Sequence, residues 1–120
     1  MTDILELNPK RVFYLFNEIS KIPRPSKHEE QIIAWIVNFG NSLGLMTQKD
    51  EAGNILISKP ATPGKEHVTP VIFQSHIDMV CEKENNLQFD FYKDPIQMYV
   101  DGEWLRAKGT TLGADNGIGM

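Results

Sequence analysis

Apolar residues at helical spacing mark the first predicted helix of the chain. Asn8 and Pro9 form a favourable opening, with asparagine as the N-cap and proline at the first helical position. A stripe of apolar side chains follows at intervals of three and four and ends before Pro23: Val12, Leu15, Phe16 and Ile19. The prolines of the segment 22–25 cannot continue a helix, so we predict a break there.

A second amphipathic helix is predicted to begin at Ser26. Ser26 and Glu29, three residues later, match the pattern of a capping box. Gly44 is placed to end the helix in a left-handed conformation. The apolar face between these ends comprises Ile32, Ile33, Ile36, Phe39 and Leu43. We therefore expect both helices to face the core.

The remaining apolar pattern is that of short strands. Residues 45–50 and 54–58 flank a turn that contains Gly53 and predict one hairpin. Residues 98–100 and 103–106 flank Asp101-Gly102, which suits a type I′ turn, and predict a second hairpin. Residues 71–73 form an apolar run of β-formers that is typical of a buried strand. These helices and strands together indicate an α/β fold, a mixed sheet with flanking helices.

Composition narrows the class of protein. The chain has 120 residues, 41% hydrophobic and 23% charged, which matches one globular domain. A net charge of −4 without a basic cluster argues against a nucleic-acid partner. We expect no membrane association, because the N-terminus has no signal-peptide pattern and no apolar run approaches the roughly 20 residues of a membrane span. A single cysteine, Cys81, fits a reducing compartment, so we expect a cytoplasmic location.

Two short segments carry candidate chemistry. His76 and Asp78 follow the predicted strand at 71–73, and side chains two apart on a strand point to the same face. Asp115 lies in a second, glycine-rich segment at 113–119, whose backbone can turn sharply. An imidazole and two carboxylates suit a metal site, with the Asp115 loop expected to open toward His76 and Asp78. Three residues do not complete such a site.

Simpler explanations apply to the other candidates. For His76 and Asp78 taken alone, a hydrogen-bonded core histidine beside a surface aspartate is the commoner arrangement, and Asp115 shifts the balance toward a metal. Cys81 is interpreted as an incidental or buried thiol rather than a ligand. His28 and His67 are expected to face solvent. Trp35 and Trp104 are expected to be packing residues.

The segment 75–80, Ser-His-Ile-Asp-Met-Val, followed by Gly-Ala-Asp-Asn-Gly at 113–117, resembles the metal-binding half of the di-zinc exopeptidases of the aminoacylase and carboxypeptidase G type. Within that group, residues 76–83 and the opening Ile-Pro-Arg-Pro-Ser-Lys-His-Glu-Glu at 22–30 are similar to the aminoacyl-histidine dipeptidases, also called Xaa-His dipeptidases, peptidase D or bacterial carnosinases. The resemblance runs over essentially the whole chain.

The resemblance implies a role for each candidate residue. His76 would ligate one zinc, Asp115 would bridge two zincs, and Asp78 would hold the His76 imidazole from behind, as an outer partner of a metal-bound histidine usually does. Two divalent metal ions are implied, zinc above all, with cobalt or manganese as substitutes. The implied reaction is hydrolysis of dipeptides with a C-terminal histidine, such as carnosine, by a metal-activated water.

The resemblance also implies parts that this chain does not contain. A Glu-Glu pair, further acidic and histidine ligands and an inserted dimerisation domain follow later in the family. Residues 1–120 are therefore expected to form the N-terminal part of a zinc-exopeptidase (phosphorylase/hydrolase-like) catalytic domain, in a parent enzyme that is a homodimer. The isolated fragment is expected to be inactive.

Two alternatives come from other classes of protein. Residues 115–120 also resemble the adenine-contacting box of ATPases of the Hsp90, MutL and histidine-kinase type, with Glu82 and Asn86 at the spacing of their magnesium box. That magnesium box requires a helix, which the segment 82–90 does not favour, and this interpretation leaves His76 and Asp78 unexplained. The other alternative is a non-catalytic structural fragment.

Overall fold

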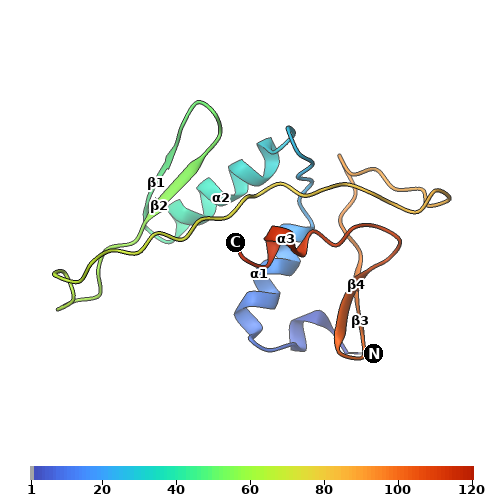
Figure 1. Cartoon of the computed structure of the whole chain (residues 1–120), viewed down its shortest axis with the longest axis horizontal. Helices are drawn as coiled ribbons and strands as arrows, with labels where there is room; N and C mark the ends of the chain where they lie inside the picture. The colour runs from blue at the N-terminus through green and yellow to red at the C-terminus, as the bar shows by residue number, and fades with distance from the viewer. Residues whose placement is uncertain (1) are drawn as a thin grey trace. The chain divides into compact units, whose positions relative to one another are not determined.

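The computed structural model describes residues 2–120, which form helices and two small sheets (Figure 1). The helical elements are η1 (Ile4–Glu6, a 3-10 helix), α1 (Lys10–Ser20), α2 (Glu30–Ser42) and the short α3 (Ala114–Gly117). The strands are β1 (Met46–Lys49), β2 (Ile55–Ser58), β3 (Met98–Asp101) and β4 (Trp104–Ala107). The predicted mixed α/β class is confirmed, but the described strands form two separate antiparallel pairs, β1–β2 and β3–β4, instead of one mixed sheet.

The chain divides into two compact units. The first holds the chain up to Ile32 together with Ser75–Met120, and the second is Ile33–Gln74. In the first unit, α1 contacts η1 and α3, and β3 contacts η1. Figure 1 shows α3, in red, against α1, in blue. The buried apolar side chains of this unit are Phe16, Ile19, Ile32 and Met79.

The helix ends differ in detail from the prediction. Pro9 has an extended ψ of 124°, so it is the N-cap of α1 and the first helical residue is Lys10. In the apolar stripe of α1, Phe16 and Ile19 are buried but Val12 is exposed. Gly44 follows α2 with a φ of +69°, as predicted for a left-handed helix end.

The predicted capping box at Ser26 is wrong. Helix α2 begins at Glu30, four residues after Ser26, because Lys27 has a φ of +70° and turns the chain before the helix starts. The Glu29 carboxylate accepts a hydrogen bond from the Lys27 backbone N–H at 2.7 Å. The Ser26 hydroxyl is therefore free to bind another partner.

Both predicted hairpins are present. In the second unit, β1 and β2 pair from Met46↔Ser58 to Lys49↔Ile55. In the first unit, Asp101 pairs with Trp104, so the two-residue turn is Gly102-Glu103 and not the predicted Asp101-Gly102. Only Gly102 of this turn has a positive φ, +61°, whereas a type I′ turn requires positive φ at both central residues.

Two predictions of burial are wrong. Residues 71–73 form no strand, and Val71, Ile72 and Phe73 are 75%, 85% and 94% exposed. A strand requires a hydrogen-bonded neighbour, and each strand of the described residues pairs only within its own hairpin. Trp104 is 67% exposed instead of packed, because its strand lies in a two-stranded hairpin. Among residues 2–120, no helix is long and apolar enough to cross a membrane.

Candidate functional site

His76 lies between two carboxylates in the first unit. Its Nδ1 is 3.1 Å from Asp78 Oδ1, and its Nε2 is 2.9 Å from Asp115 Oδ1. The structure thus brings together the three residues that the sequence singled out, although the strand that was expected to position two of them is absent. Asp78 lies on one ring nitrogen and Asp115 on the other, which is the arrangement that the proposed roles require.

The two carboxylates determine the protonation of His76. Ionised carboxylates only accept hydrogen bonds, so an imidazole that contacts one on each nitrogen must donate from both, which needs the protonated ring. The hydrogen bond to Asp115 is the main cause that raises the pKa of His76; desolvation opposes it, and the contacts with Asp78 raise the pKa further. A metal at Nε2 would have to displace this proton.

Asp78 has a second partner that the sequence reading did not find. The Ser26 hydroxyl donates a hydrogen bond to Asp78 Oδ2, while Asp78 Oδ1 faces His76. The Ser26 contact is the main reason why the pKa of Asp78 lies below its ordinary value. Ser26 was interpreted as a helix cap, so its hydroxyl was already assigned. No local pattern in the sequence marks Asp78 as the partner of Ser26, because the two residues are 52 positions apart.

Asp115 is presented by a sharply turned loop. Gly113 has a φ of +74°, a conformation that favours glycine, and Asp115 has non-helical angles of φ −94° and ψ 104° within α3. The Asp115–Asn116 peptide bond is cis. The side chain of Asp115 is 97% exposed, so its second oxygen is open to solvent or to an ion. An exposed carboxylate of this kind is suited to contact more than one metal ion.

Arg24 is the site residue that sequence reasoning missed. Its side chain is buried, and its guanidinium donates hydrogen bonds to the backbone carbonyls of Ile77, Asp78 and Gly113. The segment 22–25 was interpreted as a helix break and as part of the resemblance to dipeptidases, and Arg24 was given no role of its own. A positively charged residue between two prolines, in a segment that cannot be helical, was the available signal.

The remaining histidines and the cysteine lie outside this cluster. Cys81 Sγ donates to the Met79 carbonyl at 3.6 Å, and burial raises the pKa of the thiol, so the neutral form is favoured over the thiolate that binds metal. His28 and His67 are exposed, and the His28 ring meets the edge of Tyr92 with a centroid distance of 5.2 Å. The positions of Cys81, His28 and His67 agree with the prediction that they are not ligands.

His76 and Asp115 fit part of a zinc site. Zinc binds histidine nitrogen and carboxylate oxygen, and His76 Nε2 and Asp115 Oδ1 already face one another. The Nδ1 contact with Asp78 supplies the outer hydrogen bond that metal-bound histidines usually make. Within residues 2–120, no three His, Cys, Asp or Glu side chains are grouped so as to hold a metal ion. The two ligands therefore need further partners.

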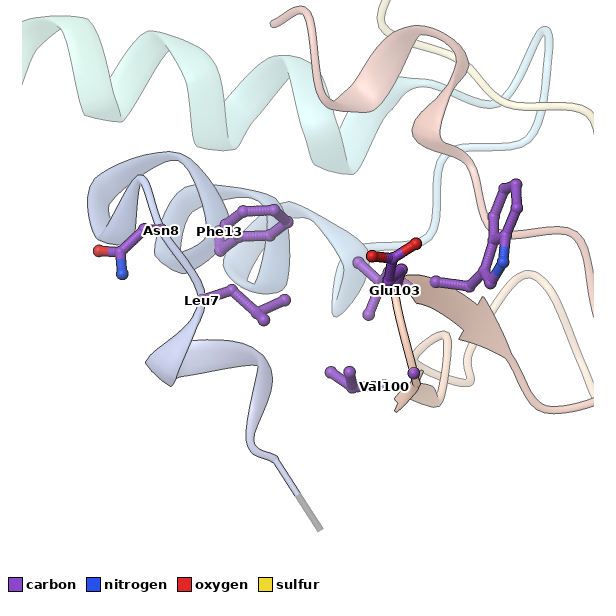
Figure 2. A pocket seen from close by; sticks show the side chains of 8 residues that line it. Leu7, Asn8, Phe13, Val100 and Glu103 are labelled. Atoms are coloured by element: carbon purple, nitrogen blue, oxygen red, sulfur yellow. The ribbon is translucent and has the colours of Figure 1, made fainter.

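A groove of the first unit is separate from this cluster. It has a volume of about 180 Å³ and lies between the segment around η1 and the β3–β4 hairpin. Figure 2 shows its lining, which includes Leu7, Asn8, Phe13, Val100 and Glu103. None of its lining residues belongs to the group of His76, Asp78 and Asp115.

The nucleotide-binding alternative lacks its magnesium box. Residues 82–86 form no helix, and Lys83 makes an isolated antiparallel bridge with Thr110. The Glu82 backbone N–H donates to the Thr111 hydroxyl at 3.3 Å. Glu82 and Asn86 are therefore not presented from one face of a helix, as that class of ATPase requires.

Comparisons with known proteins point to dipeptidases. The chain is 52% identical over 120 residues to the cytosol non-specific dipeptidase of Escherichia coli (strain K12), a match that covers 100% of this chain and 25% of the relative. The crystal structure of aminoacylhistidine dipeptidase from Vibrio alginolyticus is similar with a TM-score of 0.95 and 50% identity, over 98% of this chain and 24% of that chain. No family model matches the chain.

The chain thus spans about a quarter of the length of the relatives that it matches. The resemblance to aminoacyl-histidine dipeptidases that residues 76–83 and 22–30 indicated is confirmed. Both relatives are named as dipeptidases, enzymes that act on dipeptides.

Proposed function

We propose that this chain is the N-terminal part of the catalytic domain of a metal-dependent dipeptidase. The observation that carries the proposal is the contact of His76 with Asp78 through Nδ1 and with Asp115 through Nε2. The similarity over the whole chain to two dipeptidases supports it. In the longer protein, the reaction is hydrolysis of a peptide bond.

His76 and Asp115 would hold the metal in this proposal. The His76 Nε2 atom and the exposed Asp115 carboxylate are the donors, and Asp115 would bridge two divalent ions, zinc in the first place with cobalt or manganese as substitutes. When bound, such ions polarise the peptide carbonyl and lower the pKa of a bound water to about 7.

Asp78 contributes to the site by orienting His76. Its Oδ1 accepts from His76 Nδ1, which orients the ring and directs the other nitrogen toward Asp115. The Ser26 hydroxyl fixes the other Asp78 oxygen, so the carboxylate cannot rotate freely. The general base and the remaining ligands are proposed to come from parts of the longer protein that this chain does not include.

The substrate is proposed to be a dipeptide with a C-terminal histidine, such as carnosine. One relative is named for aminoacylhistidine substrates, and the other is named non-specific, so the choice of C-terminal residue needs direct measurement. We further propose a cytoplasmic homodimer. The single cysteine and the word cytosol in the name of the Escherichia coli relative support the location.

The test is an assay of the longer protein that carries this chain. Initial rates are measured on carnosine, on another Xaa-His dipeptide and on dipeptides without histidine, before and after removal of metal by a chelator and after return of zinc. We expect hydrolysis that is lost with the metal and restored by zinc, with Xaa-His substrates preferred. Hydrolysis that persists in the chelated enzyme and in the His76→Ala variant would overturn the proposal.

A further inference from the structure

We propose that Arg24 is a positioning residue that holds the loop of His76 and Asp78 and the loop of Asp115 at the spacing that metal binding needs. This inference rests on the proposed function, because it concerns the same candidate ligands. Within residues 2–120, the hydrogen bonds of the Arg24 side chain go to backbone carbonyls and to neither candidate ligand side chain, so its effect passes through the backbone of the two loops.

The guanidinium of Arg24 bonds to both loops at once. One terminal nitrogen, Nη1, donates to the carbonyls of Ile77 at 3.2 Å and Asp78 at 3.4 Å. The other, Nη2, donates to the carbonyl of Gly113 at 2.7 Å. The first two carbonyls belong to the two residues that follow His76, and the third lies two residues before Asp115. A single rigid group therefore sets the distance between the two segments.

The backbone of Arg24 adds a second attachment. Its carbonyl accepts from the Met79 N–H at 3.0 Å, and Pro25 and Met79 form a parallel bridge. Arg24 is thus attached to the His76 loop by main chain and side chain together. The flanking prolines fix φ on either side, which restricts the direction in which the side chain can leave the chain.

Burial makes these bonds costly to lose. Arg24 is 1% exposed. Within residues 2–120, it forms no ion pair with a carboxylate. Its charge is stabilised by the carbonyl oxygens that it contacts, and a buried charge needs such partners. A planar guanidinium offers donors in two directions, whereas a lysine ammonium is a single point of charge. Lysine should therefore be a poor substitute here.

Two glycines make room for the guanidinium. A Cβ atom on Gly113 would lie 2.6 Å from Arg24 Nη2, and one on Gly117 would lie 2.7 Å from the same atom. Gly117 is buried and, unlike Gly113, does not have a positive φ. An alanine at position 117 would crowd the guanidinium most closely, and also the Phe16 ring at 3.0 Å, while the arginine and its charge remain.

The experiment measures zinc affinity in the longer protein that carries this chain. The dissociation constant of Zn²⁺ is obtained by competition with a chromogenic chelator for wild type, Arg24→Met, Arg24→Lys and Gly117→Ala. Arg106→Met is the matched control, because Arg106 is an exposed arginine paired with Asp101 on the β3–β4 hairpin. The urea midpoint of the metal-free protein is recorded for each variant.

We expect Arg24→Met to weaken zinc binding by about 10–100-fold, the range seen when the outer partners of a metal site are removed. Arg24→Lys should recover part of this loss, Gly117→Ala should weaken binding by about tenfold, and Arg106→Met should change it less than twofold. Crystal structures of the metal-free variants should show His76 Nε2 and Asp115 Oδ1 farther apart than the 2.9 Å of the parent chain.

The outcomes separate this inference from the proposed function. If folded Arg24→Met binds zinc within twofold of wild type, while only its urea midpoint falls, Arg24 is structural and the inference is wrong. If Arg24→Met does not fold, Gly117→Ala decides the question by the same criterion. If wild type itself binds no zinc and hydrolyses no dipeptide, the proposed function fails, and the metal-free structures alone decide whether Arg24 sets the spacing of the loops.

Discussion

Ser26 and Asp78, far apart in the sequence, are joined by a hydrogen bond from the serine hydroxyl to the Asp78 carboxylate. Through this contact, the segment before α2 reaches the residue that orients His76. The path from Ser26 through Asp78 to His76 and Asp115 contains only side chains, so each contact can be removed by substitution.

Replacing Ser26 with alanine should raise the pKa of Asp78, because the Ser26 hydroxyl is the largest cause of its low value. A carboxyl whose folded pKa is depressed stabilises the fold above its unfolded pKa, and this contribution is lost as pH falls through the folded pKa. Ser26→Ala should therefore be less stable than the wild type near neutral pH, and this difference should shrink as the pH falls through the folded pKa of Asp78. The measurement is a carbon-13 NMR titration of the Asp78 carboxyl. Ser42→Ala, which removes a hydroxyl bonded to the Phe39 carbonyl, is the control and should leave that titration unchanged.

The metal-free chain should show His76 with a pKa above its ordinary value of 6.5, since Asp115 accepts from the protonated ring. A raised pKa stabilises the fold below the unfolded pKa, and the contribution is lost as pH rises through the folded pKa. Asp115→Asn should lower the pKa of His76. The check is a proton NMR titration of the ring, with Asp101→Asn on the β3–β4 hairpin as the control. A His76 pKa at or below the ordinary value would contradict the observed contacts.

Metal content should separate the roles of His76 and Asp78 in the longer protein. His76→Ala removes a direct ligand, so metal occupancy and turnover should both collapse. Asp78→Ala should leave metal bound at saturating zinc but reduce affinity or activity by about 10–100-fold, and Asp78→Asn should lose less because the amide keeps an acceptor oxygen.

The measurement is atomic emission after dialysis, beside initial rates on an Xaa-His dipeptide. An Asp78→Ala protein as empty of metal as His76→Ala would make Asp78 a direct ligand. Unchanged metal content in both variants would place the metal site elsewhere.

The isolated chain of residues 1–120 should bind zinc weakly and hydrolyse no dipeptide. Only His76 and Asp115 are available as direct ligands, and zinc sites usually have three or four protein ligands. Calorimetry with zinc and a carnosine assay on the purified chain test this. Measurable hydrolysis by the chain alone would show that the assignment of the general base to the rest of the protein is wrong.

Phe16→Ala should lower the free energy of unfolding by about 3–5 kcal/mol, the usual cost of removing a buried phenylalanine. Phe16 is 2% exposed, and it lies close enough to Gly117 that a Cβ there would approach its ring to 3.0 Å. Urea unfolding followed by circular dichroism measures the change. Tyr14→Ala removes an exposed aromatic ring from the same helix and should cost far less. Equal losses in both variants would mean that Phe16 is not a core residue.

The sequence alone located the elements whose signals are local. The stripe that contains Phe16 and Ile19, the helix stop at Gly44 and both hairpins depend on spacing and on residues suited to particular backbone angles, and the structure contains all of them. The candidate residues His76, Asp78 and Asp115 were also identified from short motifs. Motifs of this kind are local because a ligand and its orienting partner lie close together in the chain.

Tertiary structure decided the features that depend on partners distant in sequence. Ser26 had the local pattern of a helix cap, yet its hydroxyl bonds to Asp78. Residues 71–73 had the composition of a buried strand, but a strand forms only where another strand offers hydrogen bonds, and no described strand does so. The arginine between two prolines could be noticed in the sequence, but the partners of Arg24 could not be identified there, because they are backbone carbonyls, which every residue carries.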